Sequence, residues 1–276
     1  MKELKTFKML TMALACLYAS TAPALSSTQP LPNLPGTPAL QPSPTKDFTF
    51  FVCGDNRPAS ADLPVTGPAQ QIIAAAAHVR PQFIIWLGDT IYGKNPNSEK
   101  TISQEYTDFL NVAAQAHVPI FNAPGNHEMD DQNDVPNATM QSWYEQLMAP
   151  RTGSFVYGNA CFIALDTEEI APPGVTLSPG LPIGGDKNIG AGYVSAAQLS
   201  WLNTTLQQNR DKTHIFIFMH HSVYAKEPKA GLDQASANAI KQIIANYPNV
   251  AYLLSAHEHL YYCPNAPSNV TTPLFI

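Results

Sequence analysis

Residues 83–95, FIIWLGDTIYGKN, join an apolar run to a polar turn. The first five residues are all apolar, which is typical of a strand buried on both faces. Two chemistries could use the turn that follows. The spacing from Gly88 to Lys94 matches a phosphate-binding P-loop except at its last position, where Asn95 replaces Ser or Thr. Alternatively, Asp89 and Tyr92 lie three residues apart, as two metal ligands on one turn could.

Outward from this stretch, apolar strand patterns alternate with helical ones. We predict strands at 48–53, 83–87, 119–123, 214–219 and 250–255, with a further pair in 154–166 joined at Gly158-Asn159. We predict helices at 68–79, 101–116, 143–149, 195–210 and 233–246. Fully apolar strands that alternate with helices indicate an α/β fold with covered sheets.

Five of the predicted strands are followed directly by Asp, Asn or His. The segments concerned are 54–57, 88–92, 124–128, 220–221 and 257–259. In α/β folds, ligands collect at the carboxyl ends of the strands, so these side chains are expected to converge. Taken alone, an Asp after a strand is usually a turn or helix-cap residue, and His220-His221 could be a solvated pair at a strand end. Their joint occurrence in order carries the prediction of a functional site.

These side chains offer oxygen and nitrogen ligands, which suit zinc, manganese or iron. Their number exceeds what one tetrahedral ion needs. We therefore predict two metal ions that share a bridging carboxylate, an arrangement suited to displacement at phosphorus. The P-loop alternative is weaker, because Asn95 lacks the magnesium-binding hydroxyl and Pro96 disfavours helical geometry at Asn95.

The composition limits the classes of partner. The chain has 276 residues, enough for one sizeable domain and a short appendage. Charged residues make up 13%, and the net charge is −6 without a basic block. Binding of nucleic acid through a positive patch is therefore not indicated.

The N-terminus resembles a secretory signal peptide over residues 1–24. Lys2, Lys5 and Lys8 precede a short apolar run, and Ala22-Pro23-Ala24 follows it as a cleavage site. The run is too short to cross a bilayer, so no transmembrane segment is expected in the mature chain. We predict a secreted or periplasmic protein, with a lipid anchor through Cys16 as the alternative.

Residues 25–46 are rich in proline and predict an extended linker without a core. The folded, catalytic domain would then cover residues 47–276. Cys53 and Cys161 lie in apolar strands and are expected to be buried free thiols. The Gly- and Pro-rich stretch 171–192 is long enough to overhang the site as a lid.

Taken in order, the motifs resemble the calcineurin-like metallophosphoesterases. The match runs from Gly54-Asp55 through Gly88-Asp89, Gly125-Asn126-His127-Glu128 and His220 to His257-Glu258-His259, over roughly residues 48–260. The usual first motif contains a histidine where this chain has Arg57. The purple acid phosphatase branch instead uses the tyrosine of G-D-x-x-Y, and Tyr92 stands at that place, so the chain is most similar to that branch.

This resemblance implies a four-layer α-β-β-α sandwich with the active site at the C-terminal ends of the strands. It also implies a ligand set. Asp89 would bridge two metal ions; Asp55, Tyr92 and His259 would complete the first, and Asn126, His220 and His257 the second. His127 would bind the phosphate and protonate or stabilise the leaving oxygen. That Arg57 contacts a phosphate oxygen is our own inference. His221 stays outside the set, because the family pattern uses the first histidine.

The implied activity is hydrolysis of phosphate esters by in-line attack of a metal-bound hydroxide, as in acid phosphatases. The implied metals are Fe³⁺ together with Fe²⁺, Zn²⁺ or Mn²⁺, and the substrate is a phosphorylated small molecule. Two alternatives stay open: a phosphodiesterase or nucleotidase of the same superfamily, and a non-catalytic protein that binds metal or phosphate. The sequence leaves the oligomeric state and the substrate open.

Overall fold

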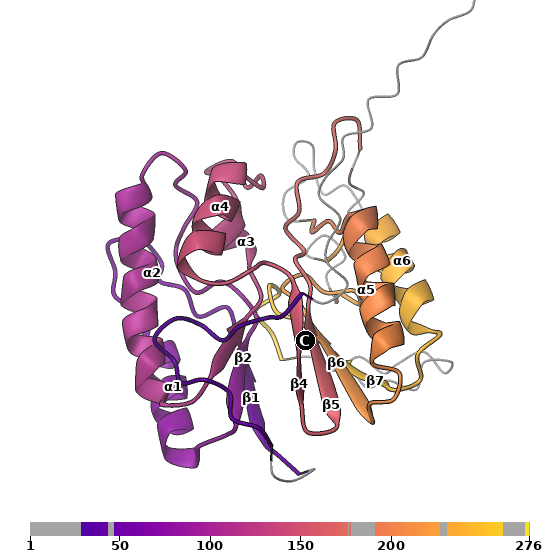
Figure 1. The fold of residues 1–276 in the computed structure, drawn as a ribbon. Coiled ribbons are helices and arrows are strands. Elements are labelled where there is room, and N and C mark those ends of the chain that lie inside the picture. Colours follow the sequence, from indigo (N-terminus) through magenta and orange to yellow (C-terminus); the bar gives the residue numbers. More distant parts are fainter. Residues whose placement is uncertain are drawn as a thin grey trace, which may run out of the picture.

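Two β-sheets face each other between two layers of helices in the computed structural model (Figure 1). The structure describes residues 29–43, 47–175, 177, 191–226 and 231–261, and the strand β8 at Leu274–Phe275. The predicted signal peptide with Cys16, and most of the predicted lid at 171–192, lie outside the described residues. The four layers agree with the predicted α-β-β-α sandwich.

The first sheet has the order β1-β2-β3 and is entirely parallel. Its strands are β1 (Phe50–Cys53), β2 (Phe83–Trp86) and β3 (Ile120–Asn122). Its outer face is covered by α1 (Gly67–Val79), α2 (Glu99–Ala113), the 3₁₀ turn η1 (Ala114–Ala116) and α4 (Ala138–Leu147). Parallel strands need such crossovers, which place all three C-terminal ends at one edge of the sheet.

The second sheet has the order β4-β5-β6-β7-β8. A hairpin joins β4 (Gly153–Tyr157) to β5 (Ala160–Ala164), and the turn between them is the predicted Gly158-Asn159. β6 (His214–Phe218) and β7 (Val250–Leu254) continue parallel to β5. The helices α5 (Ala196–Gln208) and α6 (Gln234–Ile244) cover the outer face.

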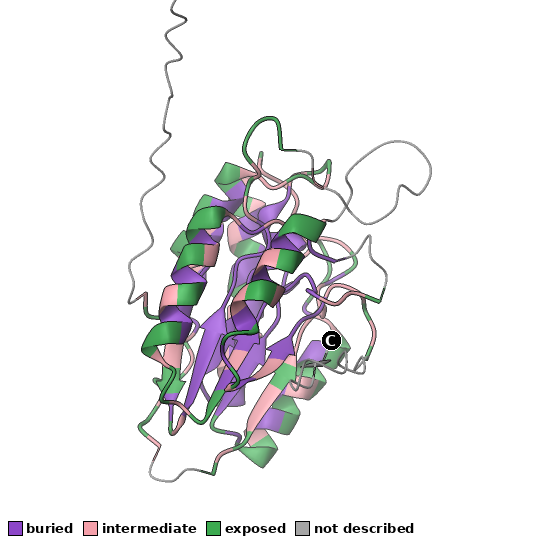
Figure 2. Ribbon diagram, turned by 90° about the vertical axis from the view of Figure 1, so that its right-hand side faces the viewer, coloured by how far each residue is buried: buried purple, intermediate pink, exposed green. Residues whose placement is uncertain are grey.

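The space between the sheets is filled largely by aromatic rings. Phe162 of β5 stacks on Phe155 of β4 with centroids 4.9 Å apart, and it meets Phe83 of β2 edge-on at 5.0 Å. Figure 2 shows the buried strands between helices whose outer faces are exposed. Tight packing of both sheets fixes the positions of their C-terminal ends, where the candidate site lies.

The predicted elements all occur, with two local differences. α4 begins at Ala138 rather than at 143, because the Asn137 side chain accepts hydrogen bonds from the amides of Thr139 and Met140. A short helix, α3 (Asn126–Met129), forms where the sequence predicted only a turn. Cys53 and Cys161 are free thiols, as predicted, but only Cys161 is buried, whereas Cys53 is half-buried.

The proline-rich segment is not a loose tether over residues 29–34. Leu31 and Leu34 are buried, and their amides donate to the carbonyls of Ser154 in β4 and Ile120 in β3, at 3.0 Å and 2.7 Å. Proline disfavours helix and strand but leaves leucine side chains free to enter the core, so a proline-rich composition alone did not exclude packing.

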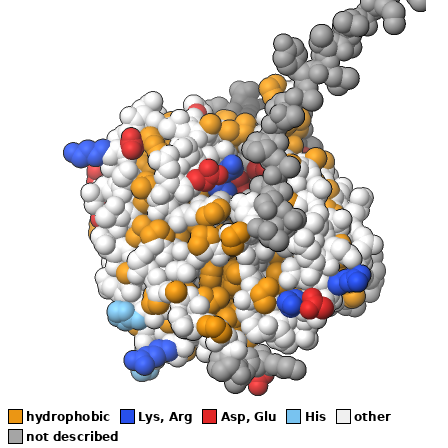
Figure 3. Space-filling view, in the orientation of Figure 1, with side chains coloured by type: hydrophobic (Ala, Val, Ile, Leu, Met, Phe, Trp, Pro, Cys, Tyr) orange, Lys and Arg blue, Asp and Glu red, His pale blue; other side chains and the backbone are white. Residues whose placement is uncertain are grey.

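Charged side chains are few and scattered on the face shown in Figure 3, in keeping with the low charge content. Within the described residues, no helix is both long and apolar enough to cross a membrane.

Candidate metal centre

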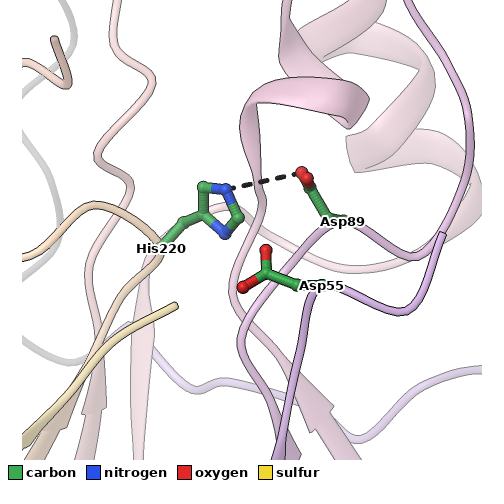
Figure 4. A group of neighbouring side chains, drawn as sticks. All are labelled: Asp55, Asp89 and His220. Carbon is green, nitrogen blue, oxygen red and sulfur yellow. Dashed lines mark ion pairs between the residues drawn. The ribbon is translucent and has the colours of Figure 1, made fainter. Parts of the chain in front are cut away.

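The loops that follow β1, β2 and β6 bring Asp55, Asp89 and His220 together. Their ligand atoms all lie within 4.8 Å of one another. Figure 4 shows the two carboxylates and the imidazole pointing toward one another from three different strand ends. Asp89 is 2% exposed and His220 is fully buried. Buried charges of this kind are retained in proteins only when they are paired or bind a metal.

Several of these residues have an uncommon backbone conformation. Asp55, Asp89, His257 and His259 have φ angles of 54°, 54°, 70° and 52°, in the left-handed region that residues other than glycine rarely adopt. Such conformations cluster at functional sites, where surrounding contacts hold them in place. Four predicted ligands share this property, which supports a common role.

Gly88 lets the turn after β2 press against the turn after β3. Its φ is +86°, and a Cβ at this position would lie 2.5 Å from the amide nitrogen of Gly125. Only glycine allows both this angle and this approach. The contact brings Asp89 and Asn126 to the same point.

Glu128 joins the two turns through a buried carboxylate. It accepts hydrogen bonds from the amides of Asp89 and Gly125, at 2.9 Å and 2.7 Å, and from the Thr90 hydroxyl at 2.7 Å. Burial raises the pKa of Glu128. The nearby carboxylate of Asp89 raises it further, while the hydrogen bonds from Thr90 oppose the shift. The sequence reading gave this residue no role, although Glu in the third helical position is a known capping signal.

His220 lies at the centre of the predicted second ligand set. Its Nε2 atom is 3.1 Å from Nδ1 of His257, 3.2 Å from Oδ1 of Asn126 and 3.4 Å from Oδ1 of Asp89. Ligands on a tetrahedral ion with bonds of about 2.0–2.1 Å are separated by roughly 3.3 Å. Nδ1 of His220 donates to the Leu87 carbonyl at 2.7 Å, so in the neutral ring Nε2 carries the lone pair. The four residues therefore fit a metal ion.

The first predicted ligand set is more open. Oδ1 of Asp55 is 3.9 Å from Nε2 of His259, and it is buried without a hydrogen-bond partner among the described residues. The His259 side chain is 62% exposed. Tyr92 is half-buried, and its ring lies beside His127 and Arg57; among the described residues no hydrogen bond joins its hydroxyl to Asp55 or His259. The unpaired Asp55 oxygen suits a cation.

A cavity of about 740 Å³ adjoins Asp55 and His259. Its walls are mainly apolar and come from β1, β6 and β7, with Phe50, Phe216 and Tyr252 among them. It therefore extends the space between the sheets, and Asp55 and His259 form part of its wall.

Burial and neighbouring charges shift the pKa values of the carboxylates and imidazoles in the centre. Burial raises the pKa of Asp89 to about 6, with His220 opposing the shift and Asp55 adding to it. Burial alone would lower the pKa of His220, but Asp89 and Asp55 outweigh this effect and raise it to about 9. Burial and neighbouring imidazoles lower the pKa of His257. A metal ion would relieve the repulsion between the two carboxylates.

The two predicted catalytic residues flank Asp89. His127 donates its amide to Oδ1 of Asp89 at 3.2 Å, and its Nδ1 donates to the carbonyl of Tyr92. Burial is the main reason that the pKa of His127 falls to about 3, so its ring is neutral at pH 7. Nε of Arg57 is 3.8 Å from Oδ2 of Asp89 and is buried without a hydrogen-bond partner among the described residues. That unpaired donor suits an anion.

His221 is fully enclosed, and its Nδ1 donates to the carboxylate of Glu168. The sequence reading missed Glu168. It follows β5 in the segment Asp166-Thr167-Glu168, so the rule of polar residues after apolar strands could have found it.

The comparisons with known proteins agree with this geometry. A family model described as calcineurin-like phosphoesterase matches residues 48–261. The chain belongs to this family. The family predicted from the motifs is thereby confirmed. A search of curated protein sequences finds no match.

Three solved structures have a similar fold. A dimetal phosphatase from Danio rerio has a TM-score of 0.61 at 16% identity, covering 83% of this chain and 86% of its own. A purple acid phosphatase from yellow lupin (Lupinus luteus) has a TM-score of 0.53 at 16% identity, and the match covers 81% of this chain and 40% of the lupin chain. PhoD has a TM-score of 0.55 at 17% identity, and the match covers 88% of this chain and 57% of the PhoD chain. These likenesses support the fold of the family member described here.

Proposed function

We propose that this protein is a dinuclear-metal phosphatase that hydrolyses esters of phosphorylated small molecules. The observation that carries this proposal is the meeting of Asp89, Asn126 and His257 around Nε2 of His220, at 3.1–3.4 Å. The family and the printed name of the dimetal phosphatase from Danio rerio support it.

Asp89 would contact both ions. Asn126, His220 and His257 would hold one of them, and Asp55, Tyr92 and His259 the other. When bound, two such ions make a nucleophilic water available near neutral pH and offset the charge on the phosphate. We propose Fe³⁺ with Fe²⁺, Zn²⁺ or Mn²⁺, because Tyr92 is available as a phenolate ligand.

Arg57 and His127 would act on the substrate itself. The unpaired Nε–H of Arg57 would donate to a phosphate oxygen. His127 has Nδ1–H fixed on the Tyr92 carbonyl, which leaves Nε2 free to hold a proton for the leaving oxygen. Its pKa is low in the free protein, and the negative charge of a bound phosphate ester would raise it toward the working pH. His127 would thus be protonated only with substrate in place.

The test uses purified protein and p-nitrophenyl phosphate. Hydrolysis is expected, and it should be lost on treatment with EDTA and restored by added metal. Asn126→Ala and His257→Ala should each lower kcat/KM by at least about 100-fold, whereas the exposed His117→Ala should not. Full activity in either ligand variant would overturn the assignment.

Two other readings have distinct outcomes in the same assay. Faster hydrolysis of bis(p-nitrophenyl) phosphate than of the monoester would favour a phosphodiesterase. Two bound metal ions per chain without turnover of either ester would favour a non-catalytic metal-binding protein.

Export from the cytoplasm is proposed on the basis of residues 1–24. Mass determination of the mature N-terminus would test it. Cleavage after Ala24 is expected, and an intact Met1 or a lipid-modified Cys16 would contradict cleavage at that position.

A further inference from the structure

His221, the second histidine after β6, lies against the candidate metal centre. Its exposed fraction is 1%. The rings of His220 and His221 are nearly perpendicular, with an interplanar angle of 84° and centroids 5.4 Å apart. Both rings lie close to His257, with centroids 5.0 Å away for His220 and 4.0 Å away for His221. The His257 ring is therefore flanked by two imidazoles.

Glu168 fixes the orientation of His221. Nδ1 of His221 donates to Oε1 of Glu168, whose residue is 3% exposed. The Thr167 hydroxyl donates to the same carboxylate oxygen at 2.9 Å and accepts from the His221 amide at 3.1 Å. Glu168 is held in turn through its backbone, since its amide donates to Asp166 at 2.8 Å. The carboxylate and the ring thus form one rigid unit.

The backbone at Gly192 lies against the base of the His221 side chain. A Cβ at Gly192 would lie 2.8 Å from Cβ and Cγ of His221. The amide of Asp233 donates to the Gly192 carbonyl at 2.8 Å, which holds this segment in place. A side chain at position 192 would therefore displace His221.

The hydrogen bond to Glu168 also defines what the ring can offer. Because Nδ1 carries the donated proton, Nε2 of the neutral ring carries a lone pair and cannot donate to a phosphate. Nε2 is buried without a partner among the described residues. The cluster of Asp55, Asp89 and His220, whose ligand atoms lie within 4.8 Å of one another, does not include His221. The ring face against His257 is therefore the contact through which His221 reaches the centre.

His257 needs such a support. Its φ of 70° holds the backbone in an uncommon conformation, and its amide donates to Oδ2 of Asp55 at 2.8 Å. Metal-binding histidines usually gain orientation from a carboxylate or carbonyl on the second ring nitrogen. Within the described part of the chain, no such oxygen accepts from the His257 ring.

We propose that Glu168 and His221 form a positioning pair that orients His257 toward the metal ion it shares with His220. This role rests on the proposed function, because it requires the metal centre. It predicts that loss of the His221 ring weakens one metal-binding step selectively, by roughly 10- to 100-fold.

The variant that isolates the ring is His221→Asn. The Asn amide can still donate to Glu168, so the buried carboxylate keeps a partner while the surface against His257 is removed. The matched control is His117→Asn, since His117 is exposed and has a φ of 55°, which Asn tolerates. Calorimetric titration of metal-free protein with Zn²⁺ measures both binding steps without relying on turnover.

In His221→Asn, one Zn²⁺ step should weaken by about 10- to 100-fold and the other by less than about twofold. Glu168→Gln, whose amide oxygen still accepts from Nδ1–H, should weaken the same step less. In a His257→Ala background, His221→Asn should have little further effect on that step, because the two changes act through one ligand.

Equal weakening of both steps, or no weakening with a lower urea midpoint, would show a merely structural role and overturn the proposal. Unchanged Zn²⁺ binding with lost turnover would overturn it too, since His221 would then act on the substrate. If the wild-type protein binds two Zn²⁺ ions but His221→Asn behaves like His117→Asn, only the positioning role fails. If the wild type binds no Zn²⁺, the metal centre fails and the role with it.

Discussion

The carboxylate of Glu128 accepts a hydrogen bond from the backbone amide of Asp89 at 2.9 Å, directly behind the side chain proposed to bridge two metals. The same carboxylate accepts from the amide of Gly125 at 2.7 Å. One buried side chain therefore sets the distance between the turns that carry Asp89 and Asn126.

Glu128→Gln should loosen this junction. A Gln amide replaces one acceptor oxygen by a donor, which leaves buried backbone N–H groups without a partner, at a loss of about 1–3 kcal/mol in the free energy of unfolding. Urea denaturation of the metal-free protein measures the loss, with the exposed Glu99→Gln as control. Equal stability of the two variants would show that the amides find other partners.

Gly88→Ala should be far more harmful than Gly174→Ala. Both glycines have positive φ angles, +86° and +88°, but a Cβ at Gly174 has nothing within 4 Å, whereas one at Gly88 lies 2.5 Å from the Gly125 amide nitrogen. The pair separates backbone strain, about 1–3 kcal/mol, from the steric clash. Urea midpoints and metal content should fall for Gly88→Ala, and comparable midpoints in both variants would contradict the clash.

Asp130 should make stability depend on pH. It is 3% exposed, and burial, with a smaller contribution from Glu168, raises its pKa to about 9 from the ordinary 3.8. Between these values the unfolded chain is ionised and the folded chain is protonated, so unfolding releases a proton and stability falls as pH rises. The slope from one such group is at most about 1.4 kcal/mol per pH unit.

Asp130→Asn removes this slope. Relative to the wild type, the variant should gain stability as pH rises from 6 to 9, whereas the exposed Asp62→Asn should follow the wild type. Urea denaturation of the metal-free proteins at several pH values gives the comparison. Parallel curves for the wild type and Asp130→Asn would show that Asp130 ionises normally in the fold.

A substitution at Tyr92 tests the proposed identity of the metal. If its phenolate binds Fe³⁺, the iron-loaded protein should absorb visible light through charge transfer, and Tyr92→Phe should lose this band. An active, colourless protein loaded with Zn²⁺ or Mn²⁺ would show instead that Tyr92 only packs beside Arg57 and His127.

The sequence predicted the fold and the order of the site motifs well, because both rest on local patterns. Apolar runs such as 83–87 identify strands, and polar residues directly after them point to the C-terminal edge of the sheet. The family match confirmed the superfamily. The proposed ligand roles remain predictions, although the structure brings Asp89, Asn126, His220 and His257 to one point.

What the sequence could not give depends on contacts between distant segments. Glu168 and His221 each follow an apolar strand, but they are 53 positions apart, and neither local pattern shows that these two side chains bind each other. The neutral state of His127 follows from burial, which motif spacing does not reveal. For the same reason, the proline-rich composition of residues 25–46 did not predict that Leu31 and Leu34 are buried.

That packing has a practical consequence. β3 and β4 are the outermost strands of their respective sheets, and residues 29–34 hydrogen-bond to both, at Ile120 and Ser154. The segment therefore acts as a brace, in that its hydrogen bonds connect the two sheets of the sandwich. A shortened protein that starts at Asp47 would lose the brace, expose two strand edges and two core leucine sites, and is expected to aggregate.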